Sequence, residues 1–196
     1  MKGGLATRIH NTEVSGKENS KSDDTFYIKG PMGKGLEMQS EGTHLAFCAG
    51  TGALVFIDLV SHLIVLNSFK ATGKGLPKEM QDFYKDGFKL HLYCSFANRD
   101  QAIGLELVET LQRLNDSLGL DNFEATIRLS KTDDGSKPLP RWDKTFIENE
   151  VSTKKNGPIA KIWAVGPPAM NQLFDQTLNN EFLARQNLLS KQVEVL

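Results

Sequence analysis

The sequence contains little cysteine, which limits the kinds of site that it can hold. Its 196 residues include only Cys48 and Cys94, too few for an iron–sulfur cluster or a disulfide-rich secreted fold. Both lie within apolar segments that read as strands, so we expect buried, reduced thiols. A cytoplasmic location is therefore the default expectation, with a membrane-associated parent protein left open as the alternative.

A basic charge excess and a long uninterrupted apolar run are also missing. The formal net charge is −1, which argues against nucleic acid or an anionic membrane surface as a partner. The longest apolar run is broken by Asp58, Ser61 and His62, so we expect no transmembrane segment. Nothing at the N-terminus resembles a signal peptide.

Groups suited to acid–base catalysis or metal binding are sparse. Asp58 and His62 lie four residues apart on an expected helix, which favours a structural pair. His91 alternates with apolar residues and is expected in the core. Residues 133–135, Asp-Asp-Gly, lack further ligands at the spacing of a calcium loop. We therefore predict neither a protein catalytic residue nor a metal site.

An apolar strand that leads straight into the glycine turn Gly50-Thr51-Gly52 is the most informative feature present. A long apolar segment follows and predicts a buried helix. Glycines lack a Cβ, so a pyrophosphate can approach the N–H groups at the start of that helix. Simple packing of the helix on the strand is the alternative. A second strand enters a comparable turn at Gly166-Pro167.

Apolar strand patterns alternate with helical patterns along the chain. This alternation predicts an α/β fold, a doubly wound and mostly parallel sheet of about five strands. Strand ends of a parallel sheet meet at one edge, where such proteins bind ligands. The expected strands are 45–49, 89–96, 123–129 and 159–165, with an edge strand within 191–196, and the expected helices are 53–67, 79–85, 104–118 and 169–178.

Five motifs in a fixed order resemble the ferredoxin–NADP reductase superfamily, most closely its cytochrome-b5 reductase and nitrate reductase branch. They are Gly-Gly-x-x-Thr, Gly-Pro-x-Gly, Ala-Gly-Thr-Gly, Phe-Ala-Asn-Arg and Gly-Pro-Pro-x-Met. The resemblance extends from Gly3 to about Leu178. It implies that residues 1–36 are the C-terminal remnant of an FAD-binding β-barrel domain, and that residues 37–196 are the NAD(P)-binding domain.

The resemblance also implies which residues contact the cofactors. The FAD pyrophosphate would be held by Gly4, Leu5, Ala6 and Thr7. The pyridine nucleotide would be bound by Gly50, Thr51, Gly52, Ser95, Asn98, Arg99, Gly166, Pro167 and Met170. The glycines at 52 and 166 would allow the ligand to pass close to the backbone, so Gly52→Val is expected to weaken binding while leaving the fold intact.

The sequence favours NADH weakly over NADPH. Only Arg99 is available after the second strand to pair with a 2′-phosphate, and Asp100 and Glu106 lie close to it in sequence. One exposed arginine set against two carboxylates gives little net attraction for the extra phosphate.

The sequence departs from the family pattern at four points. An Arg-x-Tyr-Ser segment and a proline shortly after Gly-Thr-Gly are missing, Val165 stands where a cysteine is usual, and Leu196 is not aromatic. The isolated chain is therefore expected to be incomplete and not to hold FAD stoichiometrically.

Two functional hypotheses follow from the resemblance. In the first, the complete protein is an oxidoreductase that passes a hydride from NAD(P)H to FAD and then electrons to a haem or iron acceptor. The cofactors carry this reaction, and the protein supplies binding and orientation. Its partners would be the missing FAD-binding domain or chain and the acceptor protein. In the second hypothesis, the chain is a non-catalytic nucleotide-binding subunit or sensor module that has lost flavin.

Overall fold

The computed structural model describes residues 35–73, 75–76, 84–85, 87–131, 137, 140–152 and 157–196. The main compact unit spans Met38–Leu196. The predicted FAD contacts at residues 4–7, the Asp-Asp-Gly loop at 133–135 and most of the helix expected at 79–85 lie outside the described residues. The proposed boundary between an FAD remnant and a nucleotide-binding domain therefore stays a prediction.

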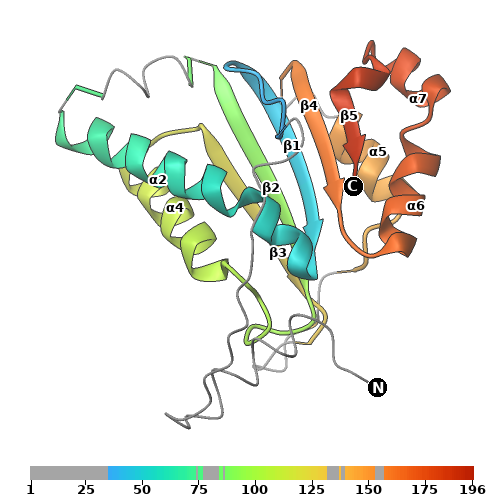
Figure 1. The fold of residues 1–196 in the computed structure, drawn as a ribbon, viewed down its shortest axis with the longest axis horizontal. Helices are drawn as coiled ribbons and strands as arrows, with labels where there is room; N and C mark the ends of the chain where they lie inside the picture. The colour runs from blue at the N-terminus through green and yellow to red at the C-terminus, as the bar shows by residue number, and fades with distance from the viewer. Residues whose placement is uncertain are drawn as a thin grey trace, which may run out of the picture. The chain divides into compact units, whose positions relative to one another are not determined.

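The described unit is built on a five-stranded parallel sheet with the order β3-β2-β1-β4-β5 (Figure 1). The chain runs outward from β1 to β2 and β3, and then returns to place β4 on the other side of β1. This arrangement confirms the predicted fold, including the C-terminal edge strand. The strands are β1 (Gly42–Ala49), β2 (Phe88–Phe96), β3 (Phe123–Leu129), β4 (Ile159–Val165) and β5 (Val193–Val195).

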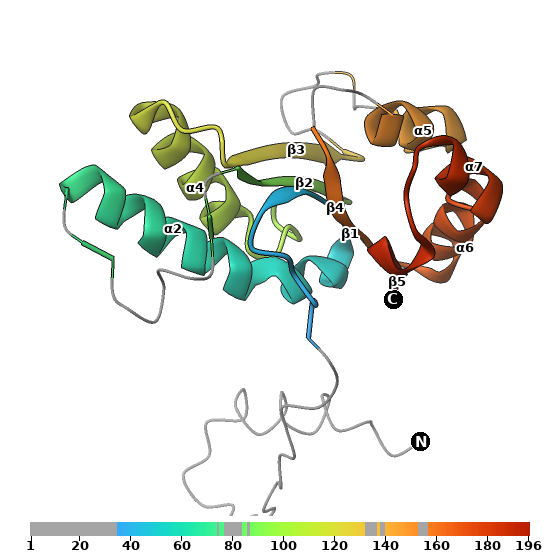
Figure 2. The same cartoon turned by 90° about the horizontal axis from the view of Figure 1, so that it is seen from above.

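Helices cover both faces of the sheet, as strands buried on both sides require. One group packs against one face and consists of the 3₁₀-helix η1 (Gly50–Phe56), α2 (Ile57–Thr72) and α4 (Leu105–Leu118) (Figure 2). The other consists of α5 (Lys144–Ser152), α6 (Pro168–Thr177) and α7 (Asn180–Arg185). Helix α7 was not predicted, because it is a single short element capped by Asn179, whose side chain accepts a hydrogen bond from the Phe182 N–H.

Side-chain alternation along the strands divides the core between the two faces. Phe47 and Tyr93 stack with their ring centroids 4.3 Å apart, on the face covered by α5, α6 and α7. Cys48 and Cys94 pair in register between β1 and β2, and both are fully buried. Their sulfur atoms lie 3.4 Å apart as free thiols, as expected from the sequence. The hydrogen bond between them and their burial raise the pKa of Cys48.

The helical segment Gly50–Thr72 is long and apolar enough to cross a membrane, by length and composition alone. Helical structure continues through Asp58, Ser61 and His62, so these residues do not shorten the helix, and the absence of a transmembrane segment stays an expectation. In the folded unit one side of the segment is buried and the other is exposed. The side chains of α2 that are buried include Leu59, Val60, Leu63 and Leu66.

Candidate functional site

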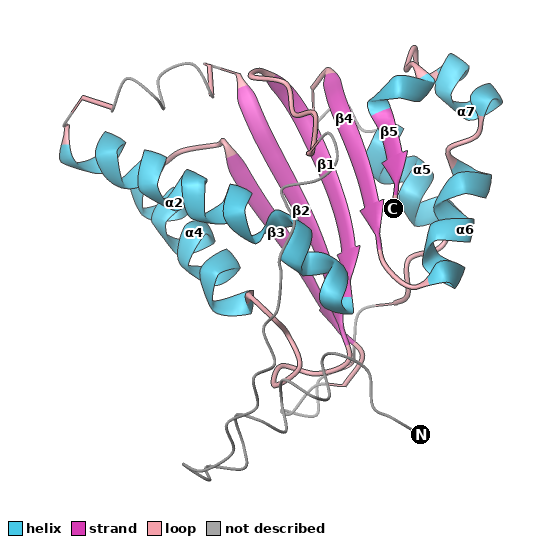
Figure 3. Ribbon diagram, in the orientation of Figure 1, coloured by secondary structure: helices cyan, strands magenta, loops and turns pink. Residues whose placement is uncertain are grey.

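Two turns meet at the carboxyl edge of the sheet. β1 ends at Ala49 and η1 begins at once with Gly50, while β4 ends at Val165 and is followed by Gly166 and Pro167 (Figure 3). β1 and β4 are neighbours and parallel, so both turns lie at the same edge. They flank the point where the chain reverses its direction of winding, which is where open α/β sheets bind ligands.

Two cavities adjoin this edge and share the walls formed by Ala49, Gly50 and Pro167. We call them the glycine cavity, of about 470 Å³, and the arginine cavity, of about 460 Å³. The glycine cavity is completed by residues from the two turns and from η1. These further residues are Thr51, Gly52, Val55, Val165 and Gly166.

The arginine cavity extends from the shared wall toward the ends of β2 and β3. Its walls combine apolar side chains, a tryptophan and two arginines. Besides the shared residues, the lining consists of Ser95, Phe96, Ala97, Arg128, Ser130, Arg141, Trp142, Ala169, Met170, Leu173 and Phe174.

Most of the nucleotide contacts predicted from the sequence line one or both cavities. They are Gly50, Thr51, Gly52, Ser95, Gly166, Pro167 and Met170. Asn98 and Arg99 line neither cavity. The Asn98 side chain accepts a hydrogen bond from the Gln101 N–H at 2.9 Å, and Arg99 Nη2 donates to Glu109 Oε2 at 2.7 Å. Local turn capping and a surface ion pair therefore hold these two side chains.

Glycine stands at the positions of the two turns for different structural reasons. A Cβ on Gly52 would lie 2.2 Å from the Val165 carbonyl oxygen, and one on Gly166 would lie 2.6 Å from Met170 Sδ. The protein's own atoms therefore occupy the space that the sequence analysis had assigned to the ligand. Gly50 differs, because it has a φ of +56° and its Cβ position is open. Of the two glycines in the Gly-Thr-Gly turn, only Gly50 leaves room for a bound group on that side.

Arg128 is the main polar group that sequence reasoning missed. It is only 8% exposed. Its Nη1 donates to Ser95 Oγ at 2.9 Å and to Ser130 Oγ at 3.0 Å, and its Nε donates to the Pro140 carbonyl at 2.9 Å. Burial, and to a smaller extent the nearby positive charge of Arg141, lower the pKa of Arg128. An arginine between Ile127 and Leu129, near the end of an expected strand, was the available sequence signal.

A buried polar network holds α5 beside the arginine cavity. The Tyr93 hydroxyl donates to Glu150 Oε2 at 2.5 Å and lies 3.0 Å from His91 Nδ1. From α5, Phe146 stacks on Trp142 with a centroid separation of 6.2 Å. Trp142 lines the arginine cavity, so the position of α5 determines part of that cavity's wall.

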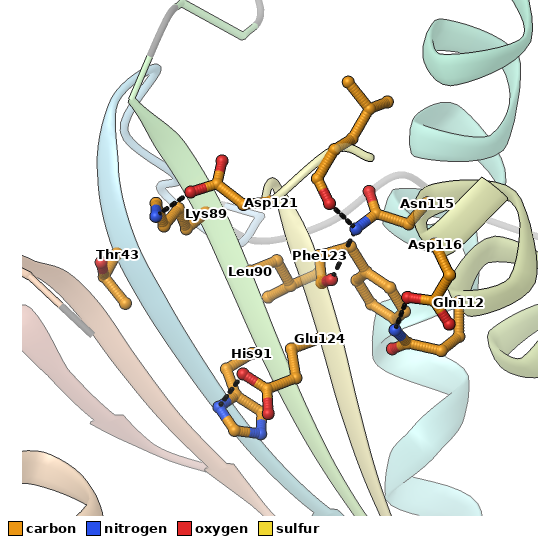
Figure 4. Close-up of a pocket in the computed structure, with 11 residues that line it drawn as sticks. Thr43, Lys89, Leu90, His91, Gln112, Asn115, Asp116, Asp121, Phe123 and Glu124 are labelled. Atoms are coloured by element: carbon orange, nitrogen blue, oxygen red, sulfur yellow. Dashed lines mark hydrogen bonds and ion pairs between the residues drawn. The ribbon is translucent and has the colours of Figure 1, made fainter. Parts of the chain in front are cut away.

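A third cavity, of about 370 Å³, lies at the opposite, amino-terminal edge of the strands (Figure 4). Its charged and amide groups bind one another. Lys89 pairs with Asp121, His91 Nδ1 lies 3.6 Å from Glu124 Oε2, and Gln112 Nε2 donates to Asp116 Oδ1 at 2.8 Å. This mutual pairing satisfies the polar surface internally, so the carboxyl edge is the better candidate site.

The described histidines and acidic residues line neither the glycine cavity nor the arginine cavity. His44 is fully buried and stacks on Trp163, while His91 is 8% exposed, which confirms its expected place in the core. Asp58 and His62 are both exposed on α2. Within the part of the chain that the structure describes, no group of three or more histidine, cysteine or acidic side chains is placed to hold a metal ion.

Comparison with known proteins identifies the fold. No protein-family model matches the sequence, and no curated protein matches it. Among solved structures, the CS-b5R domains of human Ncb5or in their NAD+ form match with a TM-score of 0.56 and 12% identity, over 85% of this chain and 39% of that chain. The domain has the ferredoxin-reductase fold. The resemblance inferred from the sequence motifs is thus confirmed at the level of fold.

Ferredoxin-NADP+ reductase from Plasmodium falciparum gives two further matches, both in complexes with 2′P-AMP. A point mutant matches with a TM-score of 0.51 and 14% identity, over 80% of this chain and 53% of that chain. The second structure matches with a TM-score of 0.50 and 16% identity, over 79% of this chain and 52% of that chain. This chain spans roughly half or less of the length of these neighbours.

Proposed function

We propose that this chain provides the NAD(P)H-binding domain of a flavoprotein oxidoreductase. The observation that carries the proposal is the pair of cavities at the carboxyl edge, which meet at Gly50 and Pro167 where the sheet changes its winding direction. A dinucleotide has two mononucleotide halves joined by a pyrophosphate. Two adjoining cavities that share a glycine at a helix start suit such a ligand.

Each part of the ligand has a matching surface. The first N–H groups of η1 attract the pyrophosphate, because they are unsatisfied donors at the positive end of a helix. The arginine cavity offers Trp142 and Met170 as an apolar surface for the adenine and its ribose. The glycine cavity, between Thr51 and Gly166, receives the nicotinamide half. The neighbours in the NAD+ form and with 2′P-AMP support a pyridine nucleotide as the ligand class.

For the complete protein we propose hydride transfer from NAD(P)H to FAD and onward electron transfer to a haem or iron acceptor. FAD supplies the change from two-electron to one-electron chemistry when it is bound. The residues of this chain bind and orient the nucleotide. A cytoplasmic location and the FAD contacts at residues 4–7 are parts of the same proposal.

The second candidate is a nucleotide-binding module without turnover. Val165 favours it, because an aliphatic side chain at the end of β4 lines the glycine cavity where the related reductases usually carry a cysteine. Because this chain is not expected to hold FAD by itself, the two candidates are separated by adding FAD, NADPH or NADH, and ferricyanide to the complete protein. Turnover supports the reductase, and nucleotide binding without turnover supports the module.

Calorimetric titration with NADH and NADPH tests the site itself. Ala169 is exposed and lines the arginine cavity, so Ala169→Trp fills the cavity without disturbing the core. We expect this variant to lose at least tenfold in nucleotide affinity. The matched control is Ala184→Trp, at an exposed alanine of α7 that lines neither cavity. Equal affinities in both variants and the wild type would move the site away from this edge.

A further inference from the structure

The arginine cavity contains a group of donors, from the ends of β2 and β3 and from the segment before α5, to which no ligand has yet been assigned. They are Arg128, Arg141, Ser95 and Ser130. We propose that this group binds the 2′-phosphate of NADPH, so that the protein prefers NADPH to NADH. The inference rests on the proposed nucleotide-binding function and makes it more specific.

Arg128 is a buried cation. The residue is only 8% exposed, and it lies in the wall of a cavity of about 460 Å³. A buried cation interacts strongly with an entering anion, since little water screens the pair. Because Nε and Nη1 of Arg128 already donate to Pro140, Ser95 and Ser130, the residue acts on a phosphate through its positive charge and through the two hydroxyls that it orients.

Two positive charges lie close together in this cavity. Arg141 lines the same cavity and is near enough for its charge to lower the pKa of Arg128. A dianion placed between two like charges relieves their repulsion and is attracted by both. A ribose 2′-hydroxyl, which NADH carries at this position, has no charge and gains nothing comparable.

The two serine hydroxyls supply further donors. Ser95 Oγ and Ser130 Oγ each accept a hydrogen bond from Arg128 Nη1, at 2.9 and 3.0 Å. A hydroxyl that accepts such a bond keeps its own O–H to donate. The arginine thus orients both hydroxyls, and each can donate its proton to a phosphate oxygen in the cavity.

The cavity also lacks the group that is typical of an NADH site. Sites that prefer NADH commonly use an aspartate or glutamate to bind the ribose 2′-hydroxyl. None of the described residues that line the arginine cavity is acidic. The residues on which the expected preference for NADH depends, Arg99, Asp100 and Glu106, do not line the cavity. Arg99 is instead paired with Glu109 on the surface.

The test compares the affinities of NADPH and NADH by calorimetric titration, with 2′-phospho-AMP and 5′-AMP as smaller probes. For the wild type we expect NADPH to bind at least tenfold more tightly than NADH, and 2′-phospho-AMP more tightly than 5′-AMP. Arg141→Gln, at an exposed arginine, should reduce the preference to threefold or less, because the affinity for NADPH falls more than the affinity for NADH. The control is Arg99→Gln, an exposed arginine outside the cavity, which should keep the full preference.

Arg128→Lys is the second variant, since it keeps a positive charge but not the fork that binds both serines. We expect it to lose most of the preference for NADPH, with its fold checked by circular dichroism. If it does not fold, the result for Arg141→Gln decides. Equal or tighter binding of NADH to the wild type overturns this inference alone, as does loss of the preference in Arg99→Gln. Failure to bind either nucleotide overturns the proposed function and this inference with it.

Discussion

Gly52 lies directly against the carbonyl oxygen of Val165, so that a Cβ on Gly52 would be 2.2 Å from that oxygen. The contact joins the start of η1 to the end of β4. It is a contact with backbone, which cannot rotate away as the end of a flexible side chain can. Glycine at position 52 therefore allows the two turns of the candidate site to approach each other, whether or not a nucleotide is bound.

Gly52→Val should destabilise the fold. We expect the free energy of unfolding to fall by about 3 kcal/mol, the upper part of the usual range for overpacking, because β4 or η1 must move to admit the side chain. Urea unfolding measures the change. Gly75→Ala is the control, because its Cβ position has no neighbour within 4 Å. A variant of wild-type stability that has lost only nucleotide affinity would support the original, ligand-based explanation.

Gly50 allows the pyrophosphate site to be tested by charge alone. Its φ of +56° suits Asn and Asp better than other side chains, and its Cβ position is open. We expect Gly50→Asp to bind NADPH at least tenfold more weakly than Gly50→Asn, a difference of about 1.4 kcal/mol, because its carboxylate repels the pyrophosphate. Titration at low and at high salt measures this. Equal affinities for the two variants would exclude a pyrophosphate beside this residue.

Tyr93→Phe should weaken the attachment of α5 to the sheet. The variant removes the hydroxyl that binds Glu150 and His91. We expect the free energy of unfolding to fall by about 1–3 kcal/mol, because a buried hydrogen bond to a carboxylate is lost. Nucleotide affinity should fall as well, since α5 carries Phe146, which stacks on Trp142. Urea unfolding measures the change in stability, and calorimetric titration measures the change in nucleotide affinity. Ser117→Ala, at an exposed hydroxyl of α4, should change neither of them.

Stability should increase with pH between about 5.5 and 7.5. Burial lowers the pKa of His44, and burial also lowers that of His91 against the opposing effect of Glu124 and Glu150. The unfolded chain therefore binds these protons more readily, and stability is lost as the pH falls below the unfolded value of about 6.5.

Urea unfolding at several pH values measures this dependence. We expect His44→Gln to reduce the slope, because one of the two buried imidazoles no longer titrates. The control is His62→Gln, which replaces an exposed side chain of α2 and should leave the slope unchanged. The same slope in wild type and His44→Gln would show that His44 does not contribute.

The sequence by itself determined the fold class and the edge at which the site lies. Central parallel strands are buried on both faces, so they appear as continuous apolar runs that can be located without tertiary information. The turns at Gly50 and Gly166 follow two such runs directly, and parallel strands bring their carboxyl ends together. These local features were sufficient to predict the sheet and the edge of the site, and the family resemblance added seven of the residues that line the two cavities, but neither arginine of the arginine cavity.

Only the tertiary structure decided what individual side chains do at that edge. The role of Arg128 depends on the pairing of β3 with β2, which brings it to Ser95, a residue 33 positions away in the sequence. Arg99 turns away because α4 places Glu109 beside it. Gly52 is explained by β4, which follows more than a hundred residues later. Such contacts depend on how distant elements pack and on the direction of each side chain, which local sequence patterns do not specify.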